Sequence, residues 1–553
     1  MKVQKGKSLL IAGCVFALLA IAAIAALLLF DVNKYKPNIE SAAFDATGLN
    51  VSINGKMELS FFPFGVSAEN IHIANKEGEI ISLENLKLGV ELMPLLKKQL
   101  KVTSCTLFKP VATIVKDADG KYNFESTEKK LTRGELGEGF RLNDLKLSQG
   151  VLVYLDKKTG EKTELKEFNL AVKDLSTGDT AVDIIRNLSL TGIFDCKEVL
   201  RKDCRIENLK ASVKAVSGIY HFEPLSIGRL VCFDKNSGEE TELKELNLTI
   251  KDLLVGDTSE AFIKNISFTG NMDCLEMRKR DLRIDNIKSP MKVEKGVLYL
   301  IPLTMDIFGS EGVGDITADR SEADARYKIN LKILKLDFAK LEESFGAEKI
   351  IGGKGALYAS LTMKEKGKRN LMSSMDGTFS LRGDNLVIYT MDLDSVLSSY
   401  ETSQKFNLVD LGAFFIAGPL GTAALKGYHY GDLYSQTQGG QGAITQFISH
   451  WKIKDGVADA KDCALATHHN RVALKGKLNL VSERYENVTV ALLDGKGCVK
   501  FKQSISGPFS SPQVGSVESL ASPIFNLYKK AKRFVQGGKC DVFYKGAVQQ
   551  PRE

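Results

Sequence analysis

Residues 155–180 read LDKKTGEKTELKEFNLAVKDLSTGDT, and residues 233–258 read FDKNSGEETELKELNLTIKDLLVGDT. These stretches are the clearest part of an internal duplication. Residues 151–228 align with 229–306 at a constant offset of 78 residues, and about 36 of the 78 aligned positions are identical. A β-sheet can accept further strands at its edge, so a duplication without gaps is typical of a sheet lengthened by a second copy.

Apolar and polar residues alternate within each copy, as in a strand with one buried and one solvated face. The apolar positions are Phe168, Leu170 and Val172 in the first copy, and Leu246, Leu248 and Ile250 in the second. Turn-forming residues precede them at 156–160 (DKKTG) and 234–238 (DKNSG). The pattern predicts a few antiparallel strands per copy, with the six apolar residues on one face.

The composition is that of a folded protein. The chain has 553 residues, of which 44 % are hydrophobic and 26 % charged, and a net charge of +7. This length allows two to four domains or one elongated sheet. Lysine and arginine are interspersed with acidic residues, so we expect no nucleic-acid partner.

Residues 8–30 contain no charged side chain, and Lys2, Lys5 and Lys7 precede them. A helix of this length reaches roughly 34 Å, which is enough to cross a bilayer. The positive flank predicts a cytoplasmic N-terminus, with the bulk of the chain on the other side of the membrane. A cleaved signal peptide is an alternative, as is a lipoprotein signal ending at Cys14, although most of the apolar run follows that cysteine.

Several segments occur together in an order that resembles the AsmA family. They are the FPFG turn at 62–65, the SLENLKLGVELMPLL segment at 82–96, and the DGKYNF turn at 119–124. Near the C-terminus, 451–457, 471–480 and 505–512 are similar to the C-terminal domain of that family. The resemblance implies a bacterial inner-membrane protein with a single span and a periplasmic bulk. It also implies a role in phospholipid traffic from inner to outer membrane.

The expected fold is mainly β. It consists of an N-terminal transmembrane helix followed by an elongated, curved, groove-like antiparallel sheet with a few short helices. The expected parts are a cytoplasmic tail (1–7), an anchor (8–30), an N-terminal AsmA-like β region (31–125), a linker (126–144), the duplicated region (145–306, with copies 151–228 and 229–306), a β extension (307–352), a C-terminal AsmA-like domain (353–514), and a C-terminal helix and tail (515–553).

Three features leave alternatives open. Cys196 and Cys204 could form a hairpin disulfide or remain unpaired strand cysteines. Residues 408–425 are apolar but contain Pro419 and three glycines, which favours a buried segment over a second membrane span. The predicted helix at 517–536 ends in a basic cluster and could either cap the sheet or contact anionic lipid.

No catalytic motif or zinc spacing is recognisable, so we expect neither an enzyme nor a cofactor or metal. An apolar sheet face needs a cover, which could be another protein layer or lipid acyl chains. The six residues of the duplicated strands are therefore candidate lipid-facing residues. The expected partners are phospholipids and the inner membrane, with the outer membrane or periplasmic bridge proteins as further candidates. The alternatives are an assembly factor for outer-membrane proteins or lipopolysaccharide, and a structural protein with a closed β-sandwich.

Overall fold

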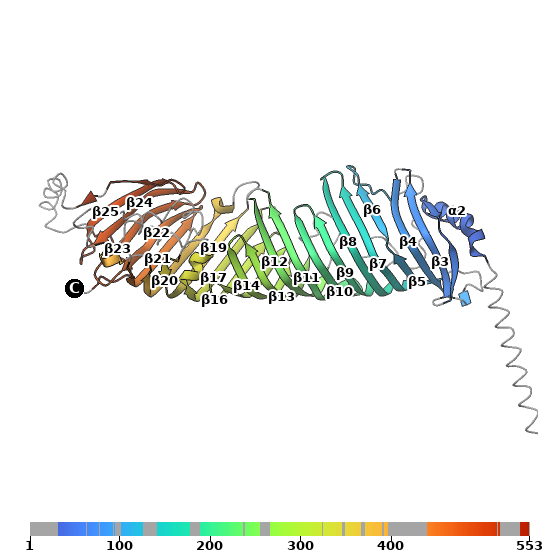
Figure 1. Cartoon of the computed structure of the whole chain (residues 1–553), viewed down its shortest axis with the longest axis horizontal. Coiled ribbons are helices and arrows are strands. Elements are labelled where there is room, and N and C mark those ends of the chain that lie inside the picture. The colour runs from blue at the N-terminus through green and yellow to red at the C-terminus, as the bar shows by residue number, and fades with distance from the viewer. Residues whose placement is uncertain are drawn as a thin grey trace, which may run out of the picture. The chain divides into compact units, whose positions relative to one another are not determined.

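The structure is a computed structural model, and it divides into two compact units, 1–257 and 258–553. It describes most of residues 31–551 (Figure 1). The residues outside the description are 1–30, 62–63, 77, 92, 95–100, 125–140, 177–187, 236–237, 255–265, 323, 345–348, 366–370, 390–391, 396, 398–439, 517, 520–541 and 552–553.

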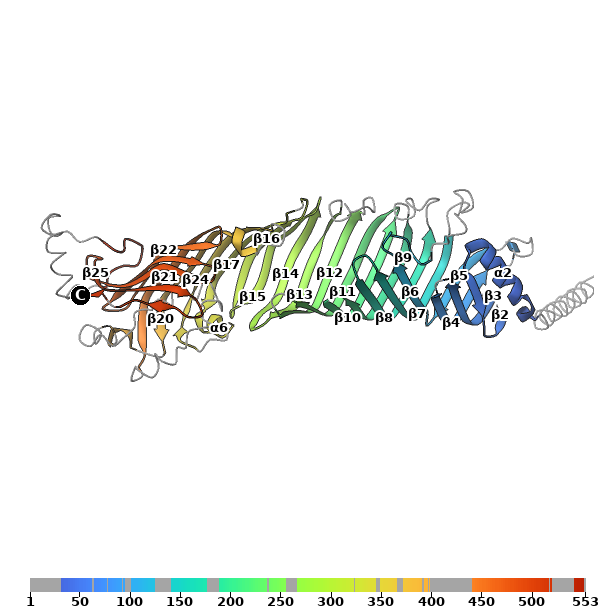
Figure 2. The same cartoon turned by 90° about the horizontal axis from the view of Figure 1, so that it is seen from above.

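Unit 1 is a sheet whose strands lie side by side in chain order from β3 onward (Figures 1 and 2). A short 3-10 helix η1 (Val32–Tyr35) and helix α2 (Lys36–Thr47) precede it. The strands are β1 (Asn50–Ile53), β2 (Met57–Phe61), β3 (Phe64–Asn75), β4 (Gly78–Val90), β5 (Val102–Phe108), β6 (Val111–Lys116), β7 (Arg141–Asp156), β8 (Glu161–Ser176), β9 (Ser189–Arg201), β10 (Cys204–Val216), β11 (Ile219–Asp234) and β12 (Glu239–Leu254).

The predicted antiparallel pairing is confirmed for most of the sheet but is wrong at one position. Strands β5 and β6 both pair with β7 in parallel, with Leu107 opposite Leu147 and Ala112 opposite Leu152. A parallel neighbour needs a long connection, and residues 117–140 separate β6 from β7. Strands β5 and β6 are separated at Lys109–Pro110, where proline cannot donate to a ladder.

The strands repeat as the duplication predicts. Strands β7–β10 and β11–β14 form two sets of four, and the first residues of corresponding strands differ by 78 positions. Two cis peptide bonds, Glu223–Pro224 and Ile301–Pro302, are separated by the same offset. The turns predicted at 156–160 and 234–238 connect β7 to β8 and β11 to β12. In the first turn, the Asp156 carboxylate accepts from the backbone N–H of Lys158 at 2.9 Å and of Thr159 at 3.1 Å.

Unit 2 continues with neighbouring antiparallel strands from β13 to β25. Its elements are β13 (Ser267–Lys279), β14 (Leu282–Glu294), β15 (Val297–Ile307), β16 (Ser310–Asp319), β17 (Arg326–Asp337), α6 (Phe338–Glu343), β18 (Ile351–Gly352), β19 (Lys354–Lys364), η2 (Leu371–Ser374), β20 (Asp376–Ile388), β21 (Gly442–Lys454), β22 (Val457–Ala466), β23 (Arg471–Asn479), β24 (Arg484–Leu493), β25 (Val499–Pro508), β26 (Gln513–Val514) and β27 (Glu518–Ser519).

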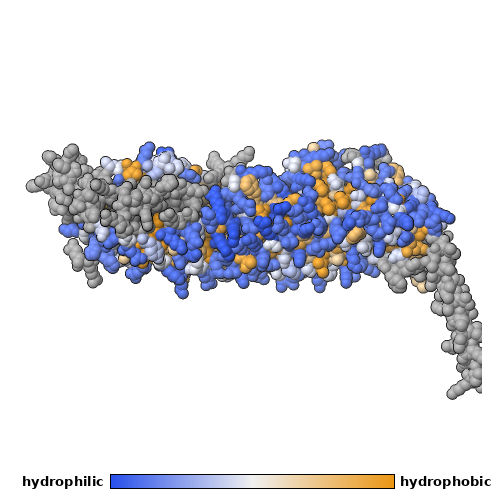
Figure 3. All heavy atoms as spheres, viewed as in Figure 1, coloured by the Kyte–Doolittle hydropathy of each residue, from blue (hydrophilic) through white to orange (hydrophobic). Residues whose placement is uncertain are grey.

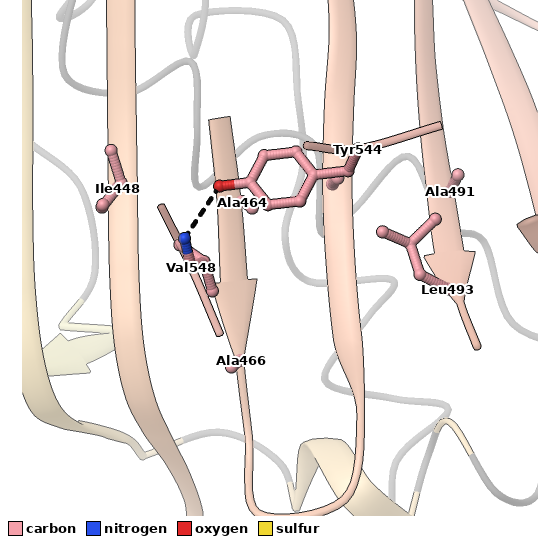
Figure 4. Close-up of a cluster of buried hydrophobic side chains, with 8 residues drawn as sticks. Ile448, Ala464, Ala466, Ala491, Leu493, Tyr544 and Val548 are labelled. Atoms are coloured by element: carbon pink, nitrogen blue, oxygen red, sulfur yellow. Dashed lines mark hydrogen bonds between the residues drawn. The ribbon is translucent and has the colours of Figure 1, made fainter. Parts of the chain in front are cut away.

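The last described segment of the chain, 542–550, lies across β21–β24 (Figure 4). Tyr544 and Val548 pack against a surface formed mostly by alanine side chains of these strands. The Tyr544 hydroxyl accepts from the Val548 N–H at 3.0 Å and donates to Asp462. The Arg471 guanidinium donates to the Val548 carbonyl at 3.1 Å. The segment therefore closes one face of the sheet at this end of unit 2.

The structure excludes a Cys196–Cys204 disulfide, and it confirms the unpaired alternative for Cys196 but not for Cys204. Cys204 forms a disulfide with Cys232, its direct partner across β10 and β11, and Cys196 is a buried free thiol. Cys196 and Cys204 lie on adjacent strands, but Cys196 is opposite Leu209, so the two cysteines are out of register. Burial raises the pKa of the Cys196 thiol.

Several predicted segments fall partly or wholly outside the described residues. The anchor, the linker core and residues 408–425 are among them. None of the described helices is long and apolar enough to cross a membrane. The helix predicted from 517 is wrong at its start, because Glu518 and Ser519 pair with the edge strand β25, and its remainder lies outside the description.

Candidate functional site

One face of the unit 1 sheet, here called the inner face, carries two uninterrupted rows of apolar residues across nine strands. Residues in each row are direct cross-strand neighbours, so their side chains touch along the row. The first row is Ala68, Leu86, Leu107, Leu147, Leu170, Phe194, Ala211, Leu225 and Leu248. The second is Ile73, Ile81, Ala112, Leu152, Leu165, Val199, Ile206, Leu230 and Leu243.

A line of irregular backbone positions, here called the crease, separates the two rows. Along it, β3, β7, β8, β10 and β12, and the break between β5 and β6, each have a residue other than glycine with positive φ. These residues are Asn70, Lys109, Gln149, Glu167, Asn208 and Glu245, with φ values between 49° and 56°. At each crease position the apolar alternation shifts by one residue. In β8, for example, Leu165 and Phe168 both face inward, while Lys166 and Glu167 lie between them.

The irregular positions at the crease affect how each strand bends. Two consecutive side chains of a strand, such as Lys166 and Glu167 in β8 or Lys244 and Glu245 in β12, fall on the polar face. The polar face of each strand therefore carries one residue more than the apolar face. Irregular residues of this kind bend a strand.

Gly150 allows close packing at the crease. It is opposite Phe168 on β8, and a Cβ at this position would lie 2.6 Å from the Phe168 ring and 2.7 Å from a Leu147 methyl group. The Phe168 ring in turn lies 6.1 Å from the ring of Phe194 on β9. A side chain at position 150 would thus displace residues from both β7 and β8.

The six residues singled out from the sequence lie together on the inner face. Phe168 and Leu246 belong to one cross-strand line, which passes through Cys196, Leu209 and Ile227. Leu170 and Leu248 lie in the first apolar row. Val172 and Ile250 belong to the next cross-strand row, further from the crease than the first apolar row. The residues between them in this row are Gly192, Val213 and Phe222. Whether they contact lipid stays a prediction.

The inner face is unevenly buried along β7–β12, where Val172, Ala211 and Leu246 are buried. Leu170, Phe194, Leu225 and Leu248 are all half-buried, although every one is a large apolar residue in the middle of the sheet. At the beginning of the sheet the same face is better covered. There, Val32 of η1 packs with Ile53, Met57, Ala68, Ile71 and Leu83 in a buried cluster. The central strands therefore leave apolar surface that the described chain does not fully cover.

The opposite, outer face is polar and rich in ion pairs. The Glu198 carboxylate on β9 forms ion pairs with the Lys166 ammonium at 2.9 Å and with the Arg205 guanidinium at 2.6 Å. The hydrogen bond from Lys166 lowers the pKa of Glu198, with a further contribution from Arg205. Arg229 forms a further ion pair on this face, with its guanidinium 2.6 Å from the Glu242 carboxylate. Figure 3 shows a mostly hydrophilic surface interrupted by hydrophobic patches. The charged side chains keep one face of the sheet in water.

Unit 2 has an inner face of the same kind. Leu300, Ile316, Ile329 and Leu361 form a half-buried apolar row across β15, β16, β17 and β19. Closer to the C-terminus the face is closed by α6. There Phe338 is 2 % exposed and its ring packs edge-on against Phe447, with centroids 6.0 Å apart. The open and the closed zones thus share one sheet within this unit.

A model of the AsmA family matches residues 3–218. This match supports the resemblance of the N-terminal part of the chain to the AsmA family. The AsmA match ends between β10 and β11, where the four-strand set begins again. It therefore includes η1, α2 and the first set of repeated strands, while the second set lies beyond it. No curated protein and no solved structure matches the chain.

The crease is the feature of this protein that we did not predict. Its signal in the sequence is a pair of consecutive polar residues inside an alternating strand, after which the apolar residues change from even to odd positions or the reverse. Leu165–Val172 and Leu243–Ile250 both contain such a shift. Among the described residues, no group of three histidine, cysteine or acidic side chains could hold a metal ion.

Proposed function

We propose that this protein carries phospholipids between the inner and outer membranes of a bacterium, with their acyl chains on the inner face. The proposed arrangement places an anchor at 8–30 in the inner membrane and the sheet in the periplasm. The role would support outer-membrane biogenesis by binding and transfer, without a chemical reaction. The match to the AsmA family supports a place in the bacterial envelope.

The observation that carries the proposal is the pair of apolar rows. Each row crosses nine strands without a polar residue, a distance of roughly 38 Å at about 4.8 Å per strand. Moving an acyl chain into water costs about 0.8 kcal/mol per CH₂, so a two-chain phospholipid faces a barrier above roughly 20 kcal/mol. A continuous apolar surface would lower that barrier along its whole length.

The disulfides support the proposed compartment. Cys204 is paired with Cys232, and Cys498 is also disulfide-bonded. Disulfides persist in oxidising compartments such as the bacterial periplasm and are rare in the cytosol. A periplasmic sheet would form these bonds during folding.

Neighbouring residues of β9 provide a direct test. Phe194 lies on the inner face, whereas Ile193 lies on the outer face and is 61 % exposed. We would replace each in turn with p-benzoylphenylalanine in intact cells, irradiate, and analyse adducts by mass spectrometry. Phospholipid adducts are expected at position 194 and not at 193. Protein adducts at 194, or equal lipid labelling at both positions, would contradict the proposal and favour an assembly factor acting by protein contact.

A further inference from the structure

Unit 2 has a second distinctive surface on the face opposite its inner rows. A hollow of about 590 Å³ lies over β16, β17, β19, β20 and β21. One cross-strand row runs through it: Val313, Lys332, Tyr358, Ser380 and His450. The size is typical of a surface that accepts a small ligand or a few side chains.

The hollow combines cationic and apolar groups. Lys332 and Arg382 both line it, and neither has an ion-pair partner among the described residues. Arg382 donates only to the Ser380 hydroxyl, at 3.4 Å. Between these cations stands Tyr358, which is 39 % exposed, and Val313 at the rim is 43 % exposed. On the outer face of unit 1, in contrast, Lys166, Arg205 and Arg229 form ion pairs with acidic neighbours.

His450, at the end of this row, contributes a ring nitrogen without a partner in the part of the chain that the structure describes. Its Nδ1 atom is buried and has no hydrogen-bond partner among the described residues. Buried ring nitrogens are normally paired, because an unpaired one costs about 1–3 kcal/mol. Its cross-strand neighbour Asp462 does not fill this role, because it accepts from Tyr544 and from the Ala547 N–H of the C-terminal segment.

The lining of the hollow also contains one acidic group. Asp315 lines the hollow, and the next cross-strand row pairs it with Asn330 and Ser360. The Ser360 hydroxyl donates to the Asn330 side chain at 2.8 Å, so these polar groups satisfy one another. The lining therefore carries two cations, Lys332 and Arg382, and one carboxylate, Asp315, so that its net charge is positive.

We propose that this hollow docks an acidic segment of a partner protein. Carboxylates of the segment would pair with Lys332 and Arg382, and an apolar side chain beside them would pack on Tyr358 and Val313. A partner group that reaches the row would satisfy the free nitrogen of His450. The shallow, open form fits a peptide segment, and the opposite charges would speed its docking. This contact is separate from lipid binding on the inner face.

The test uses the full chain in nanodiscs of neutral lipid. The probe is a short fluorescein-labelled peptide that alternates Glu and Leu, and binding is followed by fluorescence anisotropy. The variant Lys332→Glu with Arg382→Glu should weaken binding by about tenfold or more, because two attractive charges become repulsive. The matched control, Lys328→Glu with Lys452→Glu, reverses two exposed lysines outside the hollow on β17 and β21. It should bind the peptide as the unmodified protein does.

Three outcomes would overturn the proposal. One is absence of peptide binding to the unmodified protein, and another is an equal loss in both double variants. The third is that the hollow variant loses binding to anionic vesicles but not to the peptide, which would assign the surface to a membrane. Bound lipid, measured in the same preparations, should not differ between the variants, so this result is independent of the lipid-carrying proposal.

Discussion

Gly150 is the residue at which the packing of the inner face can be tested most simply. Gly150→Ala would place a methyl group 2.6 Å from the Phe168 ring, so that Phe168 or Leu147 must move. Overpacking of this kind costs about 1–3 kcal/mol. We expect lower resistance to thermal unfolding and faster proteolysis within unit 1. Gly495→Ala is the control, because no heavy atom lies within 4 Å of a Cβ there, and it should leave both properties unchanged.

The crease residues lead to a second prediction at this scale. Asn208 has a φ of 56°, where a β-branched side chain is strained. Asn208→Val should therefore destabilise unit 1 by about 1–2 kcal/mol, whereas Asn208→Gly should be tolerated. The two variants can be compared by urea unfolding. Equal stability of the valine and glycine variants would show that the crease is not held in this conformation.

At the scale of elements, the disulfide between β10 and β11 can be mapped chemically. Non-reducing peptide mass spectrometry should find Cys204 linked to Cys232, while Cys196 should react with an alkylating agent only after unfolding. Replacing both Cys204 and Cys232 with serine should cost about 3 kcal/mol, as expected for a closed loop of this length. A peptide linking Cys196 to Cys204 would contradict the cross-strand register.

Helix α6 predicts a pH dependence. The Glu342 carboxylate accepts from the N–H groups of Ile350 at 2.8 Å and of Ile351 at 3.1 Å, which connects α6 to β18. Burial raises the pKa of Glu342 to about 7, against the opposing effect of these hydrogen bonds. The pKa is higher in the folded state than in the unfolded state. Its contribution to stability is therefore complete below about pH 4.5 and is lost as the pH rises through about 7.

The variant Glu342→Gln removes this titration. Thermal unfolding of the unmodified protein should show stability declining between about pH 4.5 and 7, by an amount on the order of 3 kcal/mol at most. The decline should be much smaller in the glutamine variant. Glu343→Gln is the control, because Glu343 lies on the exposed side of α6 and pairs with Lys340. If the two variants have the same pH profile, Glu342 is not the titrating group.

The sequence predicted which segments form strands more accurately than it predicted how those strands pair. Alternation predicted the strands around Phe168 and Leu246, and the duplication predicted that both lie on one face. It could not identify the parallel pairing of β7, because pairing direction depends on a connection that has no apolar pattern. It also missed Cys232 as the partner of Cys204, since their proximity is set by the hairpin register of β10 and β11 and not by the repeat.

At the scale of the whole molecule, the arrangement separates two kinds of surface. Within each unit, one face of the sheet carries apolar rows, and the other carries ion pairs or the cationic hollow. Duplication of the four-strand set lengthens both faces together without adding a polar site. We therefore expect the number of bound lipids to depend on the number of strands that expose inner-face rows. Deleting 219–296, one complete strand set, should reduce the lipids bound per chain and leave lipid binding itself intact, as measured by native mass spectrometry.

The central claim is that the inner face holds lipid, and the lipid content of the gently extracted protein tests it most directly. Native mass spectrometry should find several phospholipids per chain. Leu170→Asp with Leu248→Asp, which places charges in the first apolar row, should remove most of them. Asn169→Ala with Asn247→Ala, on the outer face of the same strands, should not. Absence of lipid from the unmodified protein, or equal lipid content in the two variants, would contradict the account.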